Sequence, residues 1–86
     1  MQFVRTERFK RAYLNLEPAE QDLVRKALRQ LAADRTHSGL RVKRVQGTDG
    51  IWEMRAGRDI RITFEISADF YTLRNVGHHD APLRKP

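Results

Sequence analysis

Residues 51–66, IWEMRAGRDIRITFEI, contain two arms of alternating apolar and polar side chains, and this alternation constrains the fold more than any other feature. In the second arm the residues at 60, 62, 64 and 66 are apolar and those between them are polar, which is typical of a half-buried strand. The apolar set of the first arm is Trp52, Met54 and Ala56. Both sets share one face of a hairpin only if an odd number of residues separates the arms, because successive side chains point to opposite faces. A three-residue loop at 57–59, which offers glycine for a positive φ, meets this condition.

The register predicted in this way places Arg55 directly opposite Arg61, with Glu53 opposite Thr63. Like charges that face each other across two strands lower the stability of a fold by roughly a few tenths of a kcal/mol. Such a pairing is typical of an anion site, in which two guanidinium groups hold a phosphate. It is also compatible with two arginines that extend into water, or that pair diagonally with Glu53 and Glu65, since the solvated face of a sheet is often charged. The hairpin alone leaves both interpretations open.

The composition predicts a single globular domain over residues 1–86. The chain is 40% hydrophobic and 33% charged, which distinguishes it from disordered sequences. It has no cysteine, which excludes disulfides and thiolate metal sites, and we expect no cofactor. Because no apolar run approaches the length of a membrane span and no signal-peptide pattern is present, we expect no membrane contact and a cytoplasmic location. The net charge of +6 favours nucleic acid or an acidic protein as a partner.

Apolar periodicity predicts the element order β-α-α-β-β-β-β. A strand at 2–5 precedes a helix that Thr6 caps, and the apolar stripe of this helix is Phe9, Tyr13 and Leu16. Pro18 suits the first turn of a second helix, to about Ala33, with an apolar face of Leu23, Val24, Ala27, Leu28 and Leu31. A loop at 34–39, a strand at 40–45, the hairpin, a strand at 70–76 and a tail complete the chain. We therefore expect an α+β fold: a helical hairpin packed on one face of a mostly antiparallel sheet, with the other face open and charged.

The open face is expected to gather cations and one carboxylate, namely Lys43, Glu53, Arg55, Arg61 and Arg74. His78 and His79 follow near the end of the chain. Adjacent histidines on an extended segment point apart, and no third ligand stands at a recognisable spacing, so we expect no metal site.

Cations, histidines and carboxylates without a metal fit one reaction well, the cleavage of RNA by its own 2′-hydroxyl. Arg55 and Arg61 would stabilise the charge that builds on the phosphate oxygens. His78 or His79 would act as acid or base, and Glu53 would act as a base if the nearby arginines keep it ionised. The alternative for the histidines is a solvated tail or a strand-end hydrogen bond, which the sequence leaves open.

Several short motifs carry a resemblance to a known family over nearly the whole chain. They are F-x-R-A-Y at residues 9–13, L-x-P-x-x-Q at 16–21, G-L-x-x-K-R at 39–44, G-I-W-E-x-R at 50–55, R-D-x-R-I-x-F at 58–64 and V-G-H-x-D at 76–80. In this order and spacing, the chain resembles the RelE/ParE superfamily of toxins from bacterial toxin–antitoxin pairs. The resemblance implies a compact α+β fold whose concave sheet face is the working surface. In the RelE-like branch that surface cuts mRNA in the ribosomal decoding site without a metal.

The resemblance also implies roles for single residues. Arg61 matches the phosphate-stabilising arginine of the family, and Arg55 matches a basic residue on the preceding strand. Lys43 and Arg44 fall where some members carry catalytic lysines or lysines that contact rRNA. Two further arginines, Arg41 and Arg74, are expected to extend this RNA-binding surface. His78 and His79 fall where members carry a histidine or arginine, whereas the tail APLRKP lacks the base-stacking tyrosine of many nuclease members.

The resemblance implies three partners: the ribosome, mRNA, and a small acidic antitoxin that covers the sheet edge or the arginines. Two alternative functions remain. The chain resembles ParE-like inhibitors of DNA gyrase, which perform no chemistry, as well as the nucleases. It is also compatible with an inactive basic domain that binds only an antitoxin.

Overall fold

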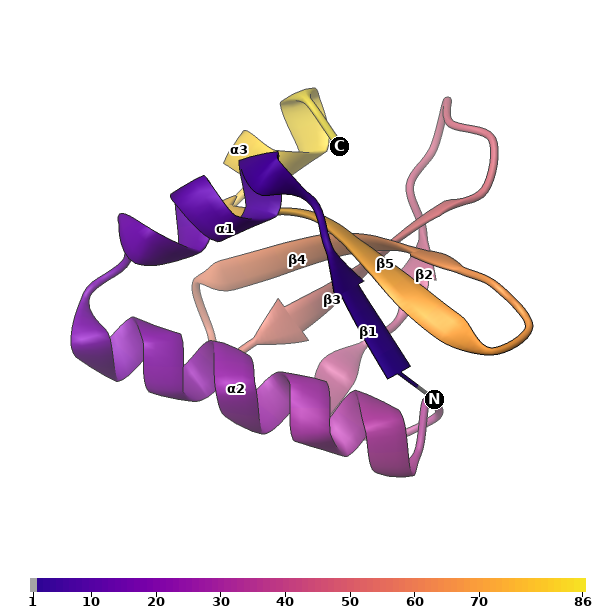
Figure 1. The fold of residues 1–86 in the computed structure, drawn as a ribbon, viewed down its shortest axis with the longest axis horizontal. Helices are drawn as coiled ribbons and strands as arrows, with labels where there is room; N and C mark the ends of the chain where they lie inside the picture. The colour runs from indigo at the N-terminus through magenta and orange to yellow at the C-terminus, as the bar shows by residue number, and fades with distance from the viewer. Residues whose placement is uncertain (1) are drawn as a thin grey trace.

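In the computed structural model, which describes residues 2–86, five strands form one sheet in the order β1-β5-β4-β3-β2 (Figure 1). The strands are β1 (Gln2–Arg5), β2 (Lys43–Arg44), β3 (Ile51–Ala56), β4 (Ile60–Ile66) and β5 (Phe70–His78). β1 runs parallel to β5, and every other neighbouring pair is antiparallel. The predicted α+β fold with a mostly antiparallel sheet is confirmed.

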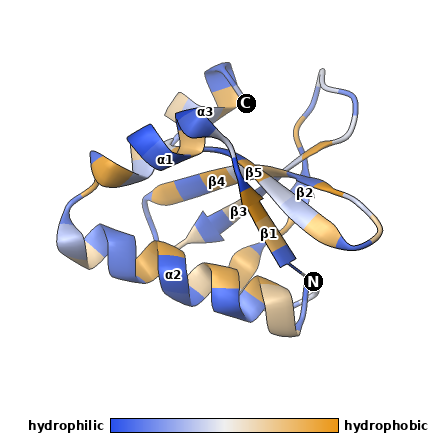
Figure 2. Cartoon of the chain, viewed as in Figure 1, coloured by the Kyte–Doolittle hydropathy of each residue, from blue (hydrophilic) through white to orange (hydrophobic). Residues whose placement is uncertain are grey.

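Two helices, α1 (Glu7–Leu14) and α2 (Pro18–Ala33), pack on one face of this sheet. The hydroxyl of Thr6 accepts a hydrogen bond from the backbone N–H of Phe9 at 3.1 Å, which caps α1 as predicted. Pro18 opens α2, and the side chains of Glu17 and Glu20 form a reciprocal capping box there. Figure 2 shows hydrophobic and hydrophilic residues mixed along both helices, as in amphipathic helices with one buried stripe.

The core lies between these helices and the inner face of the sheet. Its fully buried side chains include Val24 and Leu31 of α2 and Ile62, Phe64 and Leu73 of the sheet. The predicted hairpin register is confirmed at every pair, from Trp52 opposite Phe64 to Ala56 opposite Ile60. One residue of the predicted α2 stripe departs from it: Leu23 is 40% exposed, and its side chain lies over Gly57 at the hairpin loop.

The predicted strand at 40–45 is wrong over its first half. Ser38–Leu40 form a short 3₁₀ helix, η1, and Leu40 enters the core from it with 1% exposure. Arg41 then has a positive φ of 50°, which turns the chain, so only Lys43–Arg44 pair with β3. The alternation of apolar residues in this stretch therefore reflects two separate core contacts and not one strand.

The tail of the chain packs on the outer face of the sheet, which was expected to be open. Residues Ala81–Arg84 form a single-turn helix, α3, and Pro82 is buried beside Gly77 of β5. Beyond α3, the backbone oxygen of Pro86 accepts hydrogen bonds from Arg74 Nε at 3.0 Å and from Thr63 Oγ1 at 3.4 Å. The uncovered part of the outer face is therefore the area around β2, β3 and the start of β4.

Candidate anion-binding site

A pocket of about 420 Å³ occupies the uncovered part of the outer face. Its lining combines cations and carboxylates with two apolar side chains: Arg41, Val42, Lys43, Glu53, Arg55, Arg61, Asp80 and Leu83. We call this set the cationic pocket. Its residues come from the turn after η1, from β2, β3 and β4, and from α3 with the residue before it, so segments far apart in the sequence build it together.

Arg55 and Arg61 face each other across β3 and β4, as the sequence predicts. Arg61 Nη1 donates hydrogen bonds to the backbone oxygens of Arg58 at 3.0 Å and Ile60 at 3.2 Å, which orients its guanidinium group. Within residues 2–86 neither arginine forms an ion pair, and Glu65 pairs instead with Arg74 Nη1 at 2.6 Å. The diagonal pairing that the sequence left open is therefore not formed, and both arginines are available to an anion.

Glu53 lies in the middle of this face. It stands between Lys43 of β2 and Thr63 of β4 in the register, and it is only 9% exposed. A carboxylate among several cations reduces the repulsion between them, because opposite charges attract strongly in a partly desolvated setting. The structure therefore places Glu53, the carboxylate for which a base role was expected, among the lining residues of the cationic pocket.

His78 is not part of the cationic pocket. Its ring lies on the helix-covered face, where Nε2 is 2.5 Å from Oε2 of Glu20 on α2. The cause is an irregularity in the β4–β5 register, where Thr63 pairs with Asn75 but Phe64 pairs with Leu73. The extra residue in β5 reverses the alternation beyond it, so that His78 follows the buried Val76 and not the outward residues.

The contact between His78 and Glu20 also changes the pKa of the Glu20 carboxyl. The hydrogen bond from the imidazole lowers the pKa of the Glu20 carboxyl below its ordinary value, and a second hydrogen bond from the backbone N–H of Glu17 adds to this effect. This pair joins the end of β5 to the start of α2, which is a structural contact of the kind that the sequence left open for the terminal histidines.

His79 is exposed and does not line the cationic pocket. It has a positive φ of 52°, and its backbone N–H donates a hydrogen bond to the oxygen of Asp59 at 2.7 Å. The next residue, Asp80, does line the pocket. The terminal segment thus contributes a carboxylate to the site where sequence reasoning expected an imidazole, and the V-G-H-x-D motif was the available signal for it.

Of the predicted RNA-binding residues, Arg41 and Lys43 line the cationic pocket. Arg44 lines an adjoining hollow that shares Lys43, Glu53 and Leu83 with this pocket, whereas Arg74 has structural contacts. The guanidinium carbon of Arg44 lies 5.4 Å from the ring centre of Trp52, a cation–π contact at the sheet edge. Arg74 is bonded both to Glu65 and to the backbone oxygen of Pro86.

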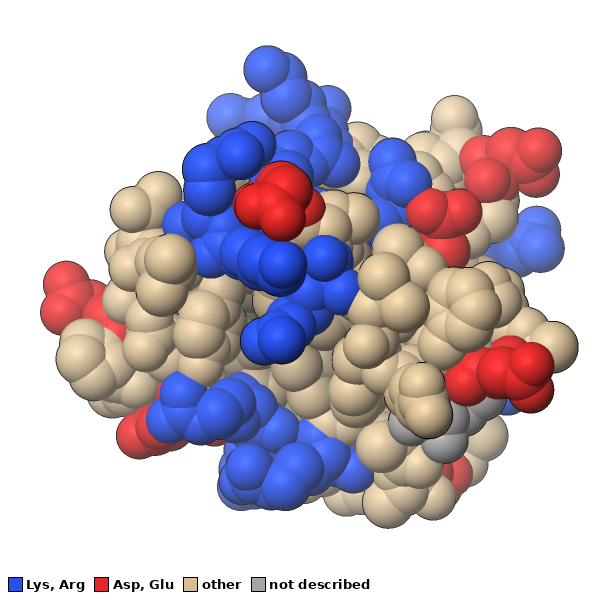
Figure 3. All heavy atoms as spheres, viewed as in Figure 1, with Lys and Arg blue, Asp and Glu red and all other residues tan. Residues whose placement is uncertain are grey.

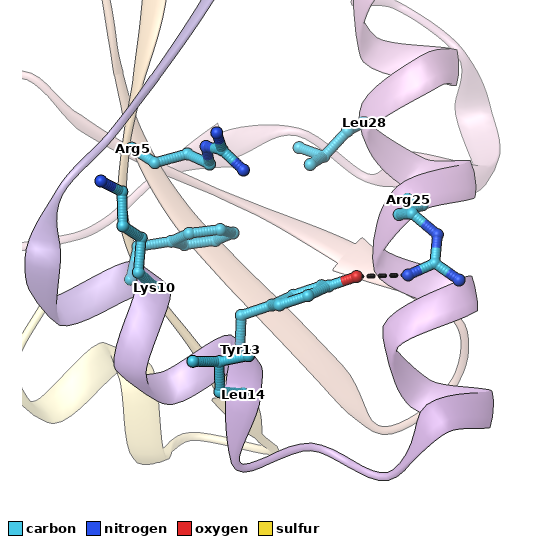
Figure 4. Close-up of a pocket in the computed structure, with 7 residues that line it drawn as sticks. Arg5, Lys10, Tyr13, Leu14, Arg25 and Leu28 are labelled. Atoms are coloured by element: carbon cyan, nitrogen blue, oxygen red, sulfur yellow. Dashed lines mark hydrogen bonds between the residues drawn. The ribbon is translucent and has the colours of Figure 1, made fainter.

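A second hollow of about 340 Å³ lies on the helical side of the molecule (Figure 4). Its floor is apolar and its rim is cationic, and the lining residues are Arg5, Phe9, Lys10, Tyr13, Leu14, Arg25 and Leu28. We call this set the helical groove. The hydroxyl of Tyr13 and the guanidinium of Arg25 form a hydrogen bond across it, between α1 and α2. Leu14, one of the lining residues, is 72% exposed, and Figure 3 shows Lys and Arg side chains over both helices with uncharged surface between them.

Sequence reasoning assigned the apolar stripes of both helices to the core and did not predict this groove. The available signal was Leu14, a leucine that lies off the apolar stripe of its helix. Residues 2–86 contain no group of three or more His, Asp or Glu side chains that could hold a metal ion. Over the same residues, no helix has the length and apolar character needed to cross a membrane.

Comparison with known proteins gives matches among solved structures only. No protein-family model and no curated protein sequence matches the chain. The fold superposes on a YoeB/ParE toxin from Agrobacterium tumefaciens with a TM-score of 0.77 and 14% identity, over 92% of this chain and 99% of that one. It superposes on YafQ from E. coli strain BL21(DE3) with a TM-score of 0.79 and 8% identity, over 94% and 96% of the two chains.

A third match is the RelB–RelE antitoxin–toxin complex from Methanococcus jannaschii, with a TM-score of 0.74 and 14% identity over 95% of this chain and 96% of that one. Identities this low establish the fold and not the chemistry, because one fold hosts several functions. The resemblance that the sequence motifs predict is thus confirmed at the level of the fold: the chain has the α+β fold shared by the RelE, YoeB and YafQ toxins.

Proposed function

We propose that this chain is the toxin of a toxin–antitoxin pair and that its cationic pocket cleaves mRNA on the ribosome, in the cytoplasm and without a metal. One observation carries the proposal: Arg55 and Arg61 face each other on the uncovered part of the sheet, free of ion pairs within residues 2–86. Arg41 and Lys43 line the same pocket. Two like charges that face each other lower the stability of the fold, and an anion bound between them would offset that cost.

The pocket suits a phosphodiester that is attacked by the neighbouring 2′-hydroxyl of the same RNA strand. In the transition state, negative charge grows on the non-bridging phosphate oxygens. Guanidinium groups that are already in place stabilise this charge without a cost of reorganisation, and their forked N–H groups match two oxygens at once. Arg61, which backbone oxygens hold in position, is the residue that we expect to contribute most.

Two observations favour a function without chemistry, such as the inhibition of DNA gyrase. His78 lies on the other face of the sheet, and the tail carries no tyrosine that could stack on a base. Expression in a bacterial host separates the two functions. A nuclease stops the incorporation of labelled methionine within minutes while DNA stays intact, whereas a gyrase inhibitor provokes a DNA-damage response while translation continues. If expression produced neither result, the chain would be an inactive domain that binds only its antitoxin.

We further propose that the antitoxin is a small acidic protein that inserts an amphipathic helix into the helical groove. The apolar floor suits the buried face of such a helix, and Arg5 on the rim suits its acidic residues. Lys10 and Arg25 also stand on the rim, and their exposed ion pairs with Glu7 and Asp22 are weak enough to be exchanged for pairs with the partner. The exposed Leu14 extends the apolar surface beyond the floor of the groove. Co-purification with an acidic protein encoded beside this one, and loss of toxicity on co-expression, are the expected results.

A further inference from the structure

Among residues 2–86, the carboxylate of Asp80 neither caps a helix nor forms an ion pair. It occupies the position before the first residue of α3, where an aspartate commonly accepts a hydrogen bond from a backbone N–H of the helix. Its side chain accepts no such bond, and it takes part in no ion pair within the same residues. Asp80 is instead one of the residues that line the cationic pocket.

The backbone around Asp80 is held in an uncommon conformation. His79 and Arg41 are the only non-glycine residues with a positive φ in the described chain, at 52° and 50°. Arg41 itself lines the cationic pocket, and His79 directly precedes Asp80, which also lines it. Residues in this sparsely populated region cluster at functional sites, where surrounding contacts such as the bond from His79 N–H to Asp59 maintain them.

No other group that faces the pocket is as well placed to accept a proton. The charged groups around Asp80 are Arg41, Lys43, Glu53, Arg55 and Arg61. Four of these five are cations. Glu53 is 9% exposed and lies in the middle of the face among them, whereas Asp80 is exposed, where a ribose can approach it. Neither terminal imidazole lines the pocket.

We propose that Asp80 is the general base of the cationic pocket, an inference that rests on the nuclease function proposed above. The O–H bond of the 2′-hydroxyl breaks and its proton passes to the Asp80 carboxylate. The 2′-oxygen bonds to phosphorus while Arg55 and Arg61 hold the non-bridging oxygens. The bond from phosphorus to the 5′-oxygen breaks, and that oxygen takes a proton from water. The products are a 2′,3′-cyclic phosphate and a 5′-hydroxyl, and Asp80 then returns its proton to the solvent.

Single-turnover cleavage of labelled mRNA on programmed ribosomes tests this assignment. Asp80→Asn is expected to lower the cleavage rate by about 100-fold or more, the usual effect of losing a general base. Asp80→Glu keeps a carboxylate and is expected to keep a measurable part of the rate. Asp69→Asn, which makes the same change in the turn between β4 and β5, serves as the matched control and should cleave like the wild type.

Two further measurements distinguish a role of Asp80 in proton transfer from a role in folding or binding. If the Asp80 carboxylate and not an imidazole takes the proton, His79→Gln should leave the pH dependence of the wild-type rate unchanged. A pH dependence that His79→Gln removes would overturn the assignment in favour of an imidazole. Ribosome binding by Asp80→Asn should be at least as tight as that of the wild type, since a negative charge beside the phosphate is lost. A slower rate that came with weaker binding would therefore also count against it.

The assignment and the function that it rests on can fail separately. If Arg61→Ala were inactive but Asp80→Asn cleaved at the wild-type rate, the nuclease would stand and the assignment of Asp80 would be wrong. If the wild-type protein left programmed mRNA intact, both would be wrong.

Discussion

Arg55 and Arg61 stand directly opposite each other on β3 and β4, and neither forms an ion pair within residues 2–86. Nearby Arg74 shows the opposite arrangement, since it is bonded to Glu65 at 2.6 Å and to the backbone oxygen of Pro86 at 3.0 Å. The outer face of the sheet thus contains one arginine that stabilises the fold and two that repel each other. This difference gives the first prediction.

Arg55→Thr should raise the free energy of unfolding by roughly a few tenths of a kcal/mol, because it removes a like-charge pair from the sheet and adds a β-branched residue. Arg74→Thr should lower it, because a partner is removed from Glu65. Urea denaturation of both variants measures whether each gains or loses free energy of unfolding. Low salt should enlarge the effect of Arg55→Thr. If both variants lost stability, the two facing arginines would not be under electrostatic strain.

The contact between His78 and Glu20 predicts a pH-dependent stability. The pKa of Glu20 in the folded chain lies below its ordinary value of 4.5, chiefly because His78 hydrogen-bonds to the carboxylate. The stabilising effect is therefore complete above pH 4.5 and is lost as the pH falls through the depressed pKa. Glu20→Gln keeps the capping oxygen but not the charge, so it should be less stable than the wild type at neutral pH and equal to it in acid.

Thermal unfolding as a function of pH measures this difference. Glu7→Gln is the matched control, because its ion pair with Lys10 is exposed and should contribute little. A difference between Glu20→Gln and the wild type that persisted in acid would show that the contact acts through packing and not through charge.

Replacing Gly57 by alanine should carry a steric cost, and the same replacement at Gly47 allows that cost to be measured separately. Gly57 has a φ of +76°, and a Cβ placed there would lie 3.0 Å from Cδ1 of Leu23. Gly47 has a φ of +78° with no atom within 4 Å of such a Cβ. Gly47→Ala should therefore cost about 1–2 kcal/mol for the left-handed conformation alone. Gly57→Ala should cost more, and the excess should disappear in a Leu23→Ala background.

The helical groove predicts which surface changes weaken binding of the antitoxin. Leu14→Asp places a charge in the apolar part of the interface and should weaken binding by at least about tenfold, since it leaves a desolvated carboxylate beside acidic residues. Lys10→Glu should act mainly by slowing association and should change the salt dependence. Calorimetry or surface-binding kinetics with the purified partner measures both, and Arg35→Glu in the loop after α2 is the control for a change of charge elsewhere.

The hairpin and the helix starts could be predicted from the sequence because each depends on contacts between near neighbours. The odd loop length determines which residues of β3 and β4 share a face, and Thr6 caps its helix through a residue three positions away. These local rules explain why Arg55 and Arg61 could be placed on one face without the structure.

The terminal histidines could not be placed in this way. Continuing the alternation from the buried Leu73 would put His78 on the outer face, but the irregularity opposite Thr63 and Phe64 moves it to the helix side. A register shift of this kind depends on how the strands pack, and the order of apolar and polar residues in the sequence does not reveal it. The same limit applies to Asp80 and to α3, whose single turn is stabilised by the distant contact of Pro82 with Gly77.

The central claim is that the facing arginines hold a phosphodiester for cleavage on the ribosome. Primer-extension mapping of cellular mRNA ends, after brief induction of the wild type and of Arg61→Ala, tests it most directly. The account predicts new ends at ribosomal A-site positions in the wild type and their absence in Arg61→Ala, with both proteins present at equal levels. The same ends in both strains, or no new ends in cells that the wild type nevertheless arrests, would contradict it.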